Sequence, residues 1–134
     1  MRWFLNNVNN AVATGDIRTY QLSVASTSVP LVVTLVWRDP AGNTIQNKLH
    51  LWIKEPSSGT VFTSDDIGNI RNNVQKVVIK APKNGIYHIE VEGVNVTKGV
   101  PELSPALRQD YALVVANTNI VLDMIFSTIV YRNR

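Results

Sequence analysis

The stretch Lys48-Leu49-His50-Leu51-Trp52-Ile53-Lys54 alternates polar and apolar side chains along its whole length, with Trp52 on the polar side. A period of two is typical of a β-strand that buries one face and exposes the other. The pattern therefore predicts that His50 and Trp52 point outward. It also predicts that Leu49, Leu51 and Ile53 face the core.

Other parts of the chain extend this β pattern. Residues 19–24 and 87–92 alternate in the same way, which predicts that Tyr87, Ile89 and Val91 face inward. Three runs rich in β-branched residues are expected to be covered on both faces: residues 31–37, 74–79 and 111–115. Turn residues separate the runs, as in Asp39-Pro40-Ala41-Gly42-Asn43. The sequence thus predicts an all-β fold, an antiparallel β-sandwich that is jelly-roll-like and has about eight strands.

A length of 134 residues indicates a single domain. Residues 14–134 are predicted to form one β-sandwich domain. Residues 1–13 are predicted to be a linker or interdomain segment, since Phe4, Val8, Ala11 and Val12 have helical spacing that suits a short helix or a linker. Residues 118–134 are a candidate additional edge strand, and an apolar edge at 120–131 would favour a homo-oligomer.

Composition excludes several classes of function. The chain has 13 Lys and Arg against 10 Asp and Glu, and the basic residues are scattered, so no nucleic-acid partner is expected. It has no Cys, which excludes a disulfide, a thiolate zinc site and a cysteine nucleophile. No apolar run approaches the ~18 residues of a membrane span, so no membrane insertion is expected.

The sequence offers few catalytic groups. Its two histidines, His50 and His88, lie on the outward sides of their strand patterns, and neither pairs by pattern with a serine and an aspartate. We therefore assign no catalytic residue and expect no cofactor. Oxygen-bearing side chains suit calcium, so the weak metal candidates are Asp39, Asp65, Asp66 and Asn69. The alternative interpretation of residues 65–69 is a solvated loop.

Two further residues are candidates for contact or modification. The outward Trp52 would stack on a sugar ring, fill a pocket of a partner, or pack under a neighbouring loop or domain. Trp37 ends a buried run and is expected in the core. Asn95-Val96-Thr97 is a glycosylation sequon, which matters only in a secreted eukaryotic protein.

An ordered series of segments resembles a known family. The most specific segment is Leu31-Val32-Val33-Thr34-Leu35-Val36-Trp37-Arg38-Asp39-Pro40. It stands in a series with residues 14–16, 47–51, 56–59, 72–77, 81–87, 93–96 and 111–115. In this order the segments resemble the C-terminal β-sandwich (jelly-roll) domain that follows the catalytic domain of some subtilisin-like serine proteases.

The resemblance implies a non-catalytic accessory domain of a larger protease, secreted or extracellular. Such a domain packs on the upstream catalytic domain of the same polypeptide, stabilises it, and often binds calcium. The catalytic motifs would lie in that upstream domain. The isolated domain would then expose an apolar patch, to which Trp3 and Phe4 would belong.

The chain departs from the family pattern at the acidic positions. Where the family commonly has Asn-Asp-Leu-Asp-Leu, this chain has Asn47-Lys48-Leu49-His50-Leu51, and Asn-Asn-Val-Glu has become Asn72-Asn73-Val74-Gln75. Three carboxylates are lost and one position has become positive. We therefore expect calcium binding in this region to be weakened or absent. The alternative function is an extracellular carbohydrate- or protein-binding β-sandwich module that uses Trp52.

Overall fold

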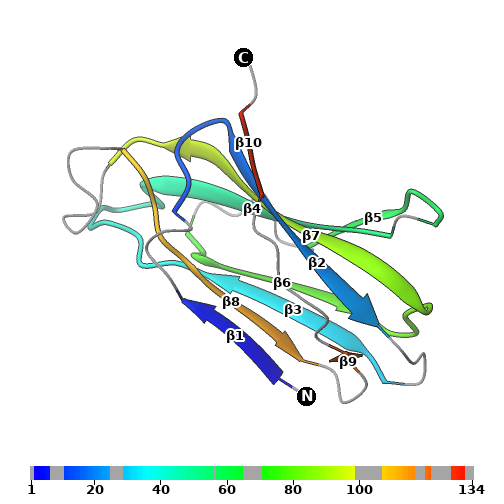
Figure 1. Ribbon diagram of the computed structural model, residues 1–134. Coiled ribbons are helices and arrows are strands. Elements are labelled where there is room, and N and C mark those ends of the chain that lie inside the picture. The colour runs from blue at the N-terminus through cyan, green and yellow to red at the C-terminus, as the bar shows by residue number, and fades with distance from the viewer. Residues whose placement is uncertain are drawn as a thin grey trace.

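The chain forms two antiparallel β-sheets that face each other as a β-sandwich (Figure 1). The computed structural model describes residues 2–6, 11–24, 29–55, 57–64, 71–98, 107–116, 120–121 and 128–131. No helix occurs among these residues. The prediction of an all-β antiparallel sandwich is confirmed.

The described residues contain ten strand segments, which make up the two sheets. One sheet has four strands in the order β1 (Arg2–Asn6), β8 (Ala112–Ala116), β3 (Leu31–Val36) and β6 (Val74–Ile79). The other has the order β10 (Thr128–Tyr131), β2 (Asp16–Val24), β7 (Gly85–Val96), β4 (Asn47–Lys54) and β5 (Val61–Thr63), and β9 (Ile120–Val121) also pairs with β2. Most connections cross from one sheet to the other, so the core is built from segments far apart in sequence.

The core lies between the sheets and follows the predicted alternation. Leu49, Leu51 and Ile53 of β4 are fully buried, and Tyr87, Ile89 and Val91 of β7 are at most 1% exposed. Trp37, directly after β3, is also in the core. These inward side chains close the space between the sheets, because successive strand residues point to opposite faces.

The four-stranded sheet differs from its prediction. Its β-branched runs were expected to be covered on both faces, yet only alternate side chains of β3, β6 and β8 are buried. The others are half-exposed or exposed, and Val78 is 47% exposed. The expectation is wrong for these strands because the six-stranded sheet covers only one of their two faces.

The N-terminal segment also differs from its prediction. Residues 2–6 form β1, which pairs antiparallel with β8 and places Phe4 opposite Val114. Ala11 and Val12 are fully buried, and Val12 exchanges two backbone hydrogen bonds with Gln109. Residues 2–6 therefore form a strand where the spacing suited a helix, whereas the assignment of residues 1–13 as a linker or interdomain segment stays a prediction. Strand pairing with β8 takes precedence over that short apolar pattern. Val8 lies outside the described residues.

The two described C-terminal strands, β9 and β10, both pair with β2 in the six-stranded sheet. β9 pairs with β2 at Ser23 and Val24, and β10 pairs with β2 from Asp16 to Thr19. Assembly through residues 120–131 remains a prediction.

Candidate functional site

The metal candidate Asp39 is engaged by the backbone. Its Oδ1 accepts a hydrogen bond from the amide of Asn47 at 2.8 Å, and its Oδ2 accepts one from the amide of Gln46 at 2.7 Å. The carboxylate thus closes the loop that leads into β4. The adjoining hollow of about 280 Å³ is also lined by Arg71, a cation that disfavours a bound metal ion. Asp65, Asp66 and Asn69 lie outside the described residues.

The three positions at which the resembled family has acidic residues do not converge. Lys48 and His50 are half-exposed members of the outward face of β4, whereas Gln75 of β6 is 1% exposed and lies in the interior. In the described part of the chain, no group of three or more His, Asp or Glu side chains is arranged to hold a metal ion.

Gln75 joins the two sheets. Its Oε1 accepts a hydrogen bond from the Leu51 amide at 2.8 Å, and its Nε2 donates one to the Leu49 carbonyl at 2.8 Å. β5 pairs with β4 only from Trp52 to Lys54, so Gln75 satisfies backbone groups of β4 beyond that pairing. An amide suits this place because it offers both a donor and an acceptor, whereas a carboxylate offers only acceptors.

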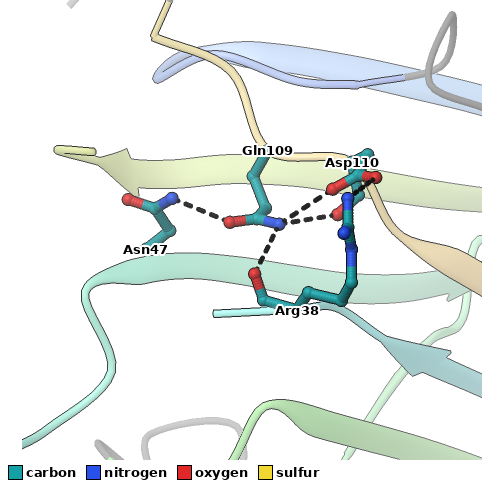
Figure 2. A network of polar contacts seen from close by, with 4 residues as sticks. All are labelled: Arg38, Asn47, Gln109 and Asp110. Carbon is teal, nitrogen blue, oxygen red and sulfur yellow. Dashed lines mark hydrogen bonds and ion pairs between the residues drawn. The ribbon is translucent and has the colours of Figure 1, made fainter. Parts of the chain in front are cut away.

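A buried polar network lies at one end of the sandwich (Figure 2). Gln109 is at its centre: its Oε1 accepts a hydrogen bond from Asn47 Nδ2 at 2.8 Å, and its Nε2 donates to the Arg38 carbonyl and to Asp110. Asn47 and Gln109 are both fully buried. The Asn47 Oδ1 accepts from the amides of Thr97 and Lys98, so this side chain ties β4 to the end of β7 and to the segment before β8.

Sequence reasoning missed this network and Gln75, although a signal was present. Asn47 lies two residues before Leu49 in β4, so it points to the same face as the core residues Leu49 and Leu51. In the same way, Gln75 points to the same face of β6 as Val77. A polar residue at an inward strand position must find buried partners. Those partners lie up to 62 residues away in sequence, so the alternation within one strand could not identify them.

A hollow of about 260 Å³ adjoins the network. Its lining combines apolar residues with Asn73 and the Arg38–Asp110 ion pair, whose N–O distance is 2.9 Å: Val36, Trp37, Arg38, Asn73, Asp110, Tyr111 and Ala112. Asn73 Nδ2 donates to the Trp37 carbonyl at 2.6 Å, and the Arg38 side chain is 65% exposed. Val36 and Ala112 also belong to the outer surface of the four-stranded sheet, so the hollow continues that surface.

We call this outer surface the apolar face. Its members are the outward side chains of β3, β6 and β8: Val32, Val36, Val74, Val78, Ala112, Val114 and Ala116, with Thr34 and Lys76 as the polar members. The register places them in rows, since Val32 pairs with both Val78 and Ala116. Two apolar rows therefore flank a central row in which Thr34 and Lys76 are polar and Val114 is apolar.

We call the outer surface of the six-stranded sheet the polar face. Its members are the outward side chains of β2, β4 and β7: Thr19, Gln21, Ser23, Lys48, His50, Trp52, Lys54, Ile86, His88, Glu90 and Glu92. Trp52 is outward as predicted, but it is half-buried. Its Nε1 donates to Glu92 Oε1 at 3.1 Å.

The remaining candidates are placed as follows. Trp3 and Phe4 lie on β1, opposite Val115 and Val114. Asn95 is exposed near the end of β7, where a glycan would meet solvent.

Within the residues that the structure describes, no helix has the length and apolar character needed to cross a membrane.

Comparison with known proteins does not identify a family for this chain. No protein-family model matches the chain, and no curated protein matches it at a significant level.

Proposed function

We propose that this chain is a non-catalytic accessory domain of a subtilisin-like serine protease, which packs on an upstream catalytic domain and stabilises it. The observation that carries the proposal is the apolar face. The largest apolar patch on the surface of a protein is often functional, and contact with another protein is one such use. The resemblance supplies the identity of that covering domain.

The contacts of the resembling segments support the same proposal. Trp37, Asn47 and Asn73 come from three different segments of the series. Trp37 Nε1 donates to the Asn47 carbonyl at 3.1 Å, and Asn73 Nδ2 donates to the Trp37 carbonyl. The segments that carry the resemblance therefore interlock in space, which gives a physical reason for their occurrence together. The repeated crossing between sheets suits a jelly-roll-like topology.

The size of the apolar face favours a covalently linked partner over a free one. Three strands about 4.8 Å apart and up to six residues long at about 3.3 Å per residue cover roughly 300 Å². A stable free complex buries about 800 Å² on each partner. A domain of the same polypeptide needs less area, because the linkage supplies a high effective concentration.

We expect calcium binding in this domain to be weakened or absent. Lys48 and His50 stand where the family has carboxylates, and Gln75 is committed to the β4 backbone. We expect calorimetry to detect no sub-millimolar calcium response. The proposed location is secreted or extracellular.

The test of the proposal is the intact mass and upstream sequence of the native gene product. We expect a polypeptide far heavier than this chain, with the Asp, His and Ser motifs of a subtilisin-like protease before residue 1. A native product that begins near residue 1 would refute the protease assignment.

A further inference from the structure

The polar face carries an aromatic ring among charged groups, and the proposed function does not use it. Trp52 lies opposite Glu90 on β7, and Glu90 lies opposite Thr19 on β2, so the three residues form one row across the sheet. His50 lies opposite Glu92 in the neighbouring row. Trp52 is therefore set among polar side chains from three strands.

The indole of Trp52 is held in place. Its only polar atom, Nε1, donates to Glu92 Oε1, and Glu92 is 5% exposed. The rings of His50 and Trp52 are in edge contact, with centroids 5.6 Å apart and an interplanar angle of 74°. Because the polar atom is satisfied, the half-buried ring offers a ligand mainly apolar carbon surface. A ring that is already fixed loses little conformational entropy on binding.

The charges around the indole balance each other. Lys54 Nζ lies 3.1 Å from Glu90 Oε1, and the side chains of Lys54 and Glu90 are 41% and 14% exposed. With Lys48 and Glu92 included, two cations stand against two anions on this face. The face therefore offers hydrogen-bond donors and acceptors without a net charge that would attract a polyanion or a polycation.

We propose that the polar face binds a neutral oligosaccharide, with one sugar ring stacked on Trp52. The apolar C–H face of a sugar ring complements the indole, and its hydroxyl groups complement Lys54, Glu90 and the row that continues to Thr19. The proposal does not depend on the protease assignment, because the isolated chain contains the whole face.

The test is NMR titration of the isolated chain with cellotetraose, chitotetraose, maltotetraose and mannotetraose. We expect at least one of these sugars to cause a saturable shift of the Trp52 indole N–H resonance. The Trp37 indole is an internal control, because it is 2% exposed and donates to Asn47, so its resonance should stay in place.

Two variants give the test its specificity. Trp52→Ala should weaken binding by about two- to tenfold, which corresponds to the loss of one stacking contact. Val78→Ala, on the apolar face, should leave binding unchanged. Unchanged backbone amide spectra would show that both variants fold.

Two results would overturn the proposal. In one, the Trp52 resonance does not move with any of the four sugars at millimolar concentration. In the other, it moves only with a proline-rich or aromatic peptide, so that the face binds protein instead.

Discussion

The two outer faces of the sandwich share a geometry but differ in chemistry. On each, alternate strand residues point away from the core and most are half-exposed. The apolar face carries Val32, Val36 and Val114 at these positions, whereas the polar face carries His50, Lys54 and Glu90. Alternation alone shows which residues point outward. The composition of a row across several strands shows whether that row faces water or another protein.

The contrast also separates the two roles that we propose for this small domain. The apolar face suits burial against a covalently linked domain, and the polar face suits contact with a soluble ligand. The sandwich holds these surfaces on opposite sides of one core, so both would be used at once. The predictions below test this division, from the largest expected effect to the smallest.

The inward and outward sides of β3 should respond very differently to a charge. Val33 is 1% exposed, so Val33→Asp should cost about 4 kcal/mol or more of unfolding free energy. Val32→Asp, on the apolar face, should cost about 1 kcal/mol at most. Urea unfolding of both variants is the measurement. Equal losses would show that the apolar face is part of the core.

Gln75 should tolerate a carboxylate poorly, because it belongs to the interior and to neither outer face. We expect Gln75→Glu to lose about 3 kcal/mol at pH 7, since a carboxylate cannot donate to the Leu49 carbonyl. Burial should raise the folded-state pKa of the introduced carboxyl. The loss should then be small below the unfolded pKa of about 4.3 and should grow as the pH rises through the folded pKa.

Urea unfolding at pH 4 and pH 7 measures this difference. Lys76→Glu, at the exposed neighbouring position, is the matched control and should show no such loss. A Gln75→Glu variant as stable as the parent at pH 7 would contradict the role of Gln75 as the link between the sheets.

Alkaline pH should destabilise the interior that the two faces enclose. Burial and the hydrogen-bonded hydroxyl of Tyr20 raise the pKa of Tyr111 well above its usual value, against an opposing effect of Arg18. Burial also raises the pKa of Tyr87. Both tyrosines therefore contribute stability that is present below the unfolded pKa of about 10 and is lost as the pH rises through the folded pKa.

Unfolding followed from pH 8 to pH 11 checks this expectation. Tyr111→Phe should lose about 1 kcal/mol near pH 8, where its hydrogen bond is missing, and should show a weaker alkaline loss than the parent. The same alkaline slope in both proteins would contradict the assignment.

The smallest expected effect concerns the binding of an apolar dye. The double variant Val78→Thr and Val114→Thr should reduce the fluorescence of bound anilinonaphthalene sulfonate, because it interrupts the apolar face. Its unfolding free energy should change by only about 1 kcal/mol. Gln21→Thr, on the polar face, should leave dye binding unchanged. If the double variant keeps the full signal, the dye-binding surface lies elsewhere.

Local patterns predicted the strands but not the long-range polar contacts. The alternation in β4 and β7 predicted their inward residues correctly, because a strand with one buried face has apolar side chains at every second position. It did not reveal that β1 pairs with β8, or that Asn47 meets Gln109, because those contacts join distant segments. The expectation that β3, β6 and β8 are covered on both faces was wrong for another reason: the sequence of an apolar run does not show whether its second side is covered within the same chain.

The most direct test of the central claim is thiol labelling on both faces. The chain has no Cys, so Val78→Cys and Gln21→Cys each place a single thiol on it, one on the apolar face and one on the polar face. Both should react readily with a maleimide in the isolated chain, since Val78 is 47% exposed and Gln21 is also exposed. In the native full-length polypeptide, we expect the thiol at position 78 to be protected and the thiol at position 21 to stay reactive. Equal labelling of position 78 in both contexts would contradict the claim that another domain covers the apolar face.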